Sequence, residues 1–499
     1  MSSSLLQSYM RTVLLVLVAA VFFAGCVVQR SPITGQKRAY GYSWAEEIKI
    51  GQESDPQIVA QFGLYDDERL AAYVTRIGEA VLAESHLRRP DAAPEYRNTP
   101  FTFRVLDSPV VNAFALPGGY IYVTRGLLSH LNNEAQLAVV LGHEVTHVAA
   151  RHASQRAATQ QFGMIGLIGA AIGGQAILGG SAGENILDLG STAAGLLFLQ
   201  YGRDDERESD RNGVDYAARV GYKPGEASAF FTSLKRISAQ SGGGIPSFLS
   251  SHPDPGEREQ TMLELSARWE QQGATMVEQD AYYSMLGDLT LGEDPRQGFV
   301  ENGVFYHPDM AFSFPVPPGY HVVNQPTQVG MVEPNENAIL IFSIADDATS
   351  ARDGADKLAA EEGIEAVESG AATVSGNPAH YVLADAQTDN GEVRLLSYYI
   401  EYGGRVFTFL GFANKASFST YRTVLERSMR GFDRVTEQRI LNVQPAHLRI
   451  VTTNRSGAFR SFLPKNMPEQ FTPESLAILN QVELDTQIER GQKIKLPGQ

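Results

Sequence analysis

Two histidines that lie four residues apart, with a glutamate directly after the first, are the residues of this sequence best suited to chemistry: His143, Glu144 and His147. In a helix, side chains at this spacing project from the same face, one turn above the other. Two imidazoles so placed can bind one zinc ion, and the glutamate can reach a water molecule at the metal. The pattern predicts a zinc site. The alternative is a surface helix that carries two histidines by chance.

The sequence around these residues supports a helix. Asn133 is a suitable N-cap, and Gln136 follows three residues later, as in a capping box. Apolar residues then recur at helical spacing, namely Leu137, Val140, Leu141, Val145 and Val148. We therefore expect the two histidines of the motif to share one helix face.

A third ligand is expected from another segment, because a catalytic zinc usually has three protein ligands and one open position. No third histidine follows at the short spacing of the metzincin pattern. The acidic stretch 201–210 is typical of a helix and places Glu206 and Asp210 four residues apart, on one face. The alternative for such a run is a solvated, charged helix face.

This stretch and the His-Glu-x-x-His motif together resemble a family of zinc peptidases that includes the CAAX prenyl protease, the HtpX membrane protease and the periplasmic BepA-type proteases. The second motif of the family is similar to Ser-Arg-x-x-Glu-x-Glu-Ala-Asp, and this sequence departs from it at Gly202 and Ser209. The resemblance implies one zinc ion per chain. It makes Glu206 the third ligand beside the two histidines, and Asp210 the residue that orients a ligating histidine.

Two further segments share the resemblance. Gly119, Tyr120 and Ile121 follow a turn signal and begin a predicted strand, for which the family implies an edge position beside the zinc, where backbone groups bind extended substrate. The alternative is a plain hairpin arm. A His-Pro segment with an arginine six residues on returns to the cleft in the family. Here these residues are His252 and Arg258. We expect His252 to be a latch on the zinc or a catalytic donor, and Arg258 to contact substrate. Without the resemblance His252 is an ordinary loop histidine.

Composition excludes one class of partner and leaves others open. The chain has 499 residues, 43% of them hydrophobic, which is enough for several domains. Its formal net charge of −16 argues against nucleic-acid binding, for which a basic face is expected. The single cysteine excludes an intrachain disulfide.

That cysteine ends a predicted lipoprotein signal peptide, residues 1–26. An apolar core is followed by Phe23-Ala-Gly-Cys26, a lipobox-like end. The core is shorter than the roughly 20 residues of a spanning helix, and an uncleaved anchor is the alternative. Lipid attachment at Cys26 predicts a periplasmic protein, and the absence of an aspartate after Cys26 resembles outer-membrane sorting. The Gly- and Ala-rich segment 162–180 is compatible with a mobile hairpin, a membrane contact or a buried core helix.

The expected fold is multidomain. A mainly α zinc-metallopeptidase domain with a small β-sheet (27–286) precedes an α+β sandwich domain of unknown role (299–436), which is faintly similar to the PsbP/Mog-like fold. A small LysM-like module (445–499) ends the chain. Because LysM modules bind glycans, peptidoglycan is a further candidate partner. We also expect a helical stretch to kink or break at Asp55-Pro56.

These features lead to one functional hypothesis and one rival. The hypothesis is a zinc metalloendopeptidase anchored by lipid to the outer membrane, facing the periplasm, in which Glu144 acts as general base. Unfolded or misassembled envelope proteins are its expected substrates, by family resemblance. The rival is a non-catalytic chaperone or assembly tether whose carboxyl half binds envelope partners or peptidoglycan.

Overall fold

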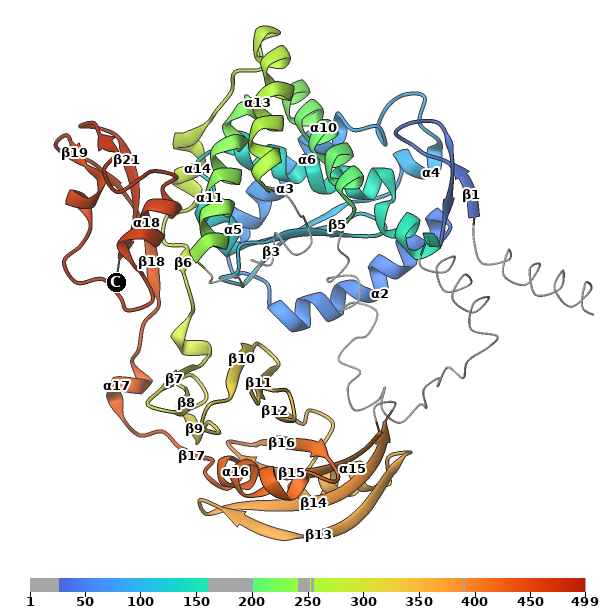
Figure 1. Ribbon diagram of the computed structural model, residues 1–499, viewed down its shortest axis with the longest axis vertical. Helices are drawn as coiled ribbons and strands as arrows, with labels where there is room; N and C mark the ends of the chain where they lie inside the picture. The colour runs from blue at the N-terminus through green and yellow to red at the C-terminus, as the bar shows by residue number, and fades with distance from the viewer. Residues whose placement is uncertain (1–26, 160–200, 241–251, 253–254, 389–390, 499) are drawn as a thin grey trace, which may run out of the picture.

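The computed structural model describes residues 27–159, 201–240, 252, 255–388 and 391–498. The predicted signal peptide with Cys26 and the segment 162–180 lie outside the described residues. Figure 1 shows a largely helical amino-terminal domain, a sheet-rich middle domain and a small carboxyl-terminal module. The expectation of a multidomain chain with a helical first part and a sheet-rich second part is confirmed.

The amino-terminal domain packs helices around a small sheet. In chain order its elements are β1 (Val27–Arg30), β2 (Lys37–Tyr40), α2 (Trp44–Phe62), α3 (Glu68–Ala83), α4 (Pro94–Arg97), β3 (Thr102–Leu106), β4 (Ala113–Leu116), β5 (Tyr120–Thr124), α5 (Arg125–His130), α6 (Glu134–Ala150), α10 (Arg203–Val220), α11 (Ala227–Gln240), α13 (Pro255–Gln271) and α14 (Gln279–Met285). The sheet has the order β3-β5-β4, with β3 parallel and β4 antiparallel to β5.

Helix α6 is the centre of this domain. Its N-cap is Asn133, whose side chain accepts a hydrogen bond from Gln136 N, and it ends at Arg151, which has a left-handed backbone (φ 63°). Every residue of α6 is buried, so the helix is surrounded on all sides rather than amphipathic at the surface. Helices α3 and α10 and strand β4 pack against it.

Helix α2 continues through Pro56, so of the two predicted alternatives, a kink or a break, the break is wrong. Proline removes one helical hydrogen bond, but the tertiary contacts on either side of it hold the helix together. Arg104 forms a two-fold hydrogen bond with Asp55 (2.7 and 2.6 Å), and Tyr122 Oη donates to the same carboxylate at 2.8 Å. Ile58, one turn further on, is fully buried.

The middle domain contains two antiparallel sheets. The larger has the order β10-β11-β12-β16-β15-β14-β13 and the smaller β17-β9-β8-β7. Their bounds are β7 (Phe299–Glu301), β8 (Val304–His307), β9 (Phe312–Pro315), β10 (His321–Gln325), β11 (Gln328–Val332), β12 (Ala338–Ile344), β13 (Ile364–Val374), β14 (Asn377–Thr388), β15 (Gly391–Tyr402), β16 (Arg405–Asn414) and β17 (Asp433–Arg434). Helix α16 (Phe418–Arg430) and the smaller sheet share a phenylalanine-rich core with one face of the larger sheet, whereas α15 (Ala351–Ala360) lies on its other face.

The carboxyl-terminal module is joined closely to the amino-terminal domain. Its strands β18 (Ala446–Thr452) and β21 (Lys493–Gly498) form a sheet with β6 (Thr290–Leu291), which belongs to the segment that leaves the amino-terminal domain. Helix α18 (Pro473–Leu479) packs against α11. The buried Lys495 donates from Nζ to the backbone oxygens of Ser129 (2.6 Å) and Leu131 (3.0 Å). The module therefore shares one hydrophobic core with the domain that contains α6.

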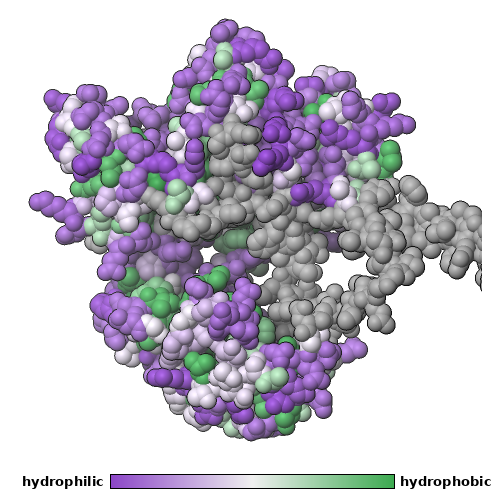
Figure 2. Space-filling model, viewed as in Figure 1, coloured by the Kyte–Doolittle hydropathy of each residue, from purple (hydrophilic) through white to green (hydrophobic). Residues whose placement is uncertain are grey.

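The described surface is that of an ordinary globular protein. On the face shown in Figure 2, hydrophilic residues dominate and hydrophobic ones are scattered, as is usual for folded proteins. In the part of the chain that the structure describes, no helix combines the length and the hydropathy that a membrane crossing needs.

Candidate active site

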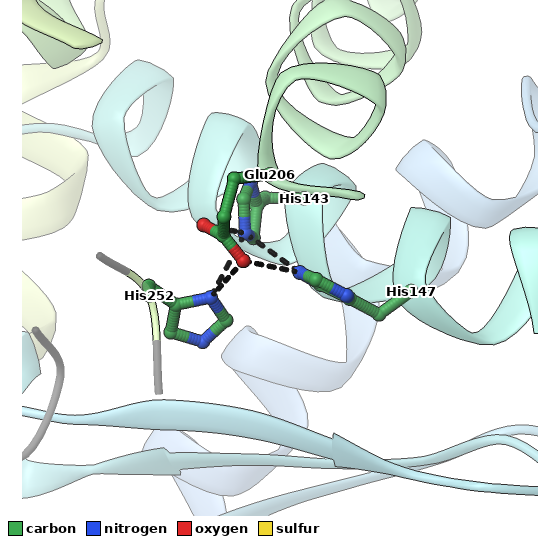
Figure 3. Close-up of side chains that lie close together, drawn as sticks. All are labelled: His143, His147, Glu206 and His252. Atoms are coloured by element: carbon green, nitrogen blue, oxygen red, sulfur yellow. Dashed lines mark hydrogen bonds and ion pairs between the residues drawn. The ribbon is translucent and has the colours of Figure 1, made fainter. Parts of the chain in front are cut away.

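Four buried side chains point toward one another at the centre of the amino-terminal domain: His143, His147, Glu206 and His252 (Figure 3). The first two come from α6, Glu206 comes from α10, and His252 precedes α13. One nitrogen or oxygen atom of each lies within 4.8 Å of the corresponding atoms of the others. The structure therefore brings together the three predicted zinc ligands and adds His252 to them.

The distances show how tightly these atoms converge. His147 Nε2 lies 2.9 Å from His143 Nε2, and the Glu206 carboxylate lies 3.4 Å from each of these nitrogens. His252 Nδ1 lies 3.0 Å from Glu206 Oε1 and 3.2 Å from His143 Nε2. Three imidazoles and a carboxylate that meet in a buried position are the donor set that zinc prefers, so these residues fit a zinc ion.

Asp210 lies behind His143, where it was predicted. Its Oδ1 is 2.9 Å from His143 Nδ1, so the imidazole donates to the carboxylate from the nitrogen that faces away from the ligand cluster. Although burial alone would raise the pKa of Asp210, Arg258 and His143 hold it below its usual value. Asp210 therefore stays ionised and orients the ring.

Arg258 is not placed as a substrate-binding residue. It is 4% exposed and donates to Asp210 through two nitrogens, at 2.6 and 2.9 Å. A third nitrogen lies 3.1 Å from Glu206 Oε2, and the guanidinium stacks 4.4 Å from the Phe231 ring centroid. The prediction of substrate contact is corrected because the charge of Arg258 is used to neutralise two buried carboxylates.

Glu144 lies beside this cluster and is completely buried. Neither oxygen of its carboxylate has a hydrogen-bond partner among the described residues, and His252 Nε2 lies 3.5 Å from Oε1. Burial raises the pKa of Glu144 above its usual value. A carboxylate with a raised pKa and free lone pairs is suited to accept a proton.

Strand β5 is the middle strand of its sheet, so the predicted edge position of Tyr120 and Ile121 is wrong. Both residues pair with β3 on one side and with β4 on the other. Gly119, in the turn before the strand, is buried, and a Cβ atom on it would lie 2.9 Å from the Phe101 ring. Strand β4 packs against α6 and, among the described residues, pairs with β5 alone.

Sequence reasoning assigned no role to three other residues at the site. The Tyr201 ring lies 3.8 Å from the His147 ring, centroid to centroid, and is 6% exposed. His152 contacts the second nitrogen of His147, and Glu208 contacts His152. The position of His152 five residues after His147 and that of Glu208 two residues after Glu206 were the only signals available.

A His-Glu-x-x-His helix with a glutamate from a second helix is the ligand arrangement that occurs in many zinc metallopeptidases. Residues 68–266 match the family model described as Peptidase family M48. The matched segment contains the three predicted ligands His143, His147 and Glu206, and members of this family use zinc.

Curated relatives carry protease names. The chain is 25% identical over 266 residues to the beta-barrel assembly-enhancing protease of Escherichia coli K12, which is 52% of this chain and 51% of that protein. It is 26% identical over 231 residues to the mitochondrial metalloendopeptidase OMA1 of Schizosaccharomyces pombe, 46% of this chain and 63% of that protein. The matches span 38% to 51% of the first three relatives. The solved structure of cyanobacterial PsbP from Synechocystis matches 26% of this chain and 91% of its own length, at 14% identity and a TM-score of 0.23.

Proposed function

We propose that this protein is a zinc metalloendopeptidase. The observation that supports the proposal best is the buried convergence of His143, His147 and Glu206 beside the Glu144 carboxylate, which has no hydrogen-bond partner among the described residues. In the proposed mechanism the first three residues hold the zinc ion. When bound, zinc supplies Lewis acidity, which polarises the scissile carbonyl and acidifies the attacking water. Glu144 takes the proton of that water and passes it to the leaving amine as the C–N bond breaks.

We propose that His252 is a latch. Its imidazole lies between the metal ligands and Glu144, with Nδ1 3.2 Å from His143 Nε2 and Nε2 3.5 Å from Glu144 Oε1. This is the space that a water molecule and a substrate carbonyl need. A substrate must displace the ring before Glu144 can act, which keeps the protease inactive until a client binds.

We infer that substrate binds along β4 rather than β5. Thr124 N donates to Asn112 O, so Asn112 and every second residue after it direct their backbone groups toward β5. Ala113 and Ala115 then direct theirs toward the other side of β4, where the described residues include no partner strand. An extended peptide that pairs with these groups is recognised through its backbone, which supports cleavage with little side-chain preference.

The cellular setting is proposed from the relatives and from the sequence. One relative is named for enhancing β-barrel assembly, so we propose unfolded or misassembled outer-membrane proteins as substrates. We also propose a lipid anchor at Cys26 in the periplasmic leaflet of the outer membrane. Mass spectrometry of the mature amino terminus tests this anchor, and an unmodified terminus at Met1 would rule it out. If the 445–499 module binds peptidoglycan, it does so with the surface left free by its contact with the amino-terminal domain.

Purified full-length protein tests the proposal. We expect about one zinc ion per chain and cleavage of an unfolded outer-membrane β-barrel protein. A chelator should abolish the cleavage, and added zinc should restore it. Protein without bound zinc, or cleavage that a chelator leaves unchanged, would reject the metallopeptidase. A Glu144→Gln protein that fully corrects envelope defects in cells would favour the chaperone or tether.

A further inference from the structure

The nitrogen of His147 that faces away from the ligand cluster contacts a second histidine, His152. His147 Nε2 faces the ligand cluster, and its Nδ1 lies 3.0 Å from Nδ1 of His152. Both rings are buried, at 2% and 0% exposure. This arrangement differs from that of His143, whose outer nitrogen donates directly to a carboxylate.

The geometry determines which nitrogen carries each proton. If Nε2 of His147 binds metal through its lone pair, its proton is on Nδ1, which then donates to His152. His152 must accept through Nδ1, so its own proton is on Nε2. That nitrogen lies 3.1 Å from Glu208 Oε2, a carboxylate that can only accept when ionised.

This series of hydrogen bonds continues into the amino-terminal hairpin, which consists of β1 and β2. Arg38, on strand β2, lies 3.4 Å from Glu208 Oε2 and donates to Gln155 at 3.3 Å. The same hairpin is fixed to the end of α6 by Arg151, which donates to Gln29 and to Tyr42 O. Strand β2 therefore contacts the far end of a series of hydrogen bonds that begins at His147.

We propose that His152, Glu208 and Arg38 are positioning residues that fix the tautomer and the orientation of His147, so that the amino-terminal hairpin is part of the support of the metal site. The inference rests on the proposed function, because it assumes that His147 is a metal ligand. Groups that orient a ligating histidine in this way typically contribute about 10–100-fold to metal affinity.

Two replacements of His152 distinguish the effect of its hydrogen bonds on zinc binding from the effect of its side-chain volume. His152→Leu keeps the bulk and removes both bonds. His152→Gln can accept from His147 through its amide oxygen and donate to Glu208 through its amide nitrogen. In the full-length protein, we expect His152→Leu to weaken zinc binding by about 10–100-fold in competition with a chelator and to change the absorption spectrum of the Co²⁺-loaded protein. His152→Gln should recover much of both. His86→Leu, which removes a half-buried histidine bonded to Tyr216, is the control.

Glu208→Ala should weaken zinc binding in the same direction, and Arg38→Ala more weakly, because Arg38 acts through Glu208. Asp204→Ala on the same helix, where the carboxylate is exposed and pairs with Arg207, should leave it unchanged. In the His152→Leu background, Glu208→Ala should weaken zinc binding little further, because both replacements break the same series of hydrogen bonds.

The outcomes separate this inference from the proposed function. A wild-type protein that binds no zinc would reject the metallopeptidase itself. A wild-type protein that binds zinc, with unchanged affinity and Co²⁺ spectrum in His152→Leu and Glu208→Ala, would overturn the positioning chain alone. If His152→Leu does not fold, as judged by circular dichroism, Glu208→Ala decides, because the Glu208 side chain is partly exposed (16%).

Discussion

Gly142 and Gly213 face each other where α6 crosses α10. A Cβ atom on Gly142 would lie 2.8 Å from Gly213 O, and one on Gly213 would lie 2.7 Å from His143 N. The two backbones can therefore approach closely only because neither residue has a side chain. This contact brings Glu206 and Asp210 of α10 within reach of the histidines of α6.

Gly213→Ala should push α10 away from the metal ligands. Overpacking of this kind typically costs about 1–3 kcal/mol of unfolding free energy, and zinc affinity should fall with it. Chemical denaturation and chelator competition measure the two effects. Gly287→Ala is the control, because its nearest neighbour would be Ser284 O at 4.0 Å. Equal stability of both variants would contradict the close-contact argument.

Arg258→Ala should leave Glu206 and Asp210 buried without a cation. Breaking a buried ion pair from one side typically costs about 3–5 kcal/mol, so we expect a large loss of unfolding free energy and loss of zinc. Arg268→Ala, on the same helix but 65% exposed, should cost little. A stable Arg258→Ala protein with weaker substrate binding would restore the role in substrate contact.

His252→Ala should cleave an unfolded model substrate faster than wild type, because the proposed latch no longer occupies the space beside Glu144. Initial rates at equal zinc occupancy are the measurement. If the rate collapses while zinc is retained, His252 is a transition-state donor. A rate equal to that of wild type would make it an ordinary structural histidine.

Lys495 should make the stability of the joined module depend on pH. Burial lowers the pKa of Lys495 well below its usual value, so the folded protein binds fewer protons there than the unfolded chain does. Unfolding free energy should therefore rise with pH as the pH approaches about 10, the usual lysine pKa. Lys495→Met should show a flatter dependence in urea titrations. Parallel curves for the two proteins would show that Lys495 is charged in the fold.

Pairs of site residues that share a helix face could be predicted from the sequence, because helical spacing alone determines them. His143 with His147, and Glu206 with Asp210, each share a face because residues four apart always do so in a helix. The pairing of the two helices was not readable from either helix alone. It depends on Gly142 and Gly213, which are 71 positions apart.

The errors concern long-range contacts. The position of β5 in its sheet is decided by β3 and β4, not by its own residues, so a β-rich pattern could not distinguish an edge from a centre. Arg258 was assigned by motif position, whereas its buried carboxylate partners decide its role. Pro56 stays in a helix because of the distant Arg104 and Tyr122.

The most direct test of the metallopeptidase is Glu144→Gln in the purified full-length protein, with zinc content and turnover measured on the same sample. The account predicts zinc occupancy equal to that of wild type, since every ligand remains, and a loss of turnover of about 10²–10⁴-fold or more, since the general base is gone. His147→Ala and Glu206→Ala should instead lose zinc. A Glu144→Gln protein that retains zinc and cleaves at the wild-type rate would contradict the account.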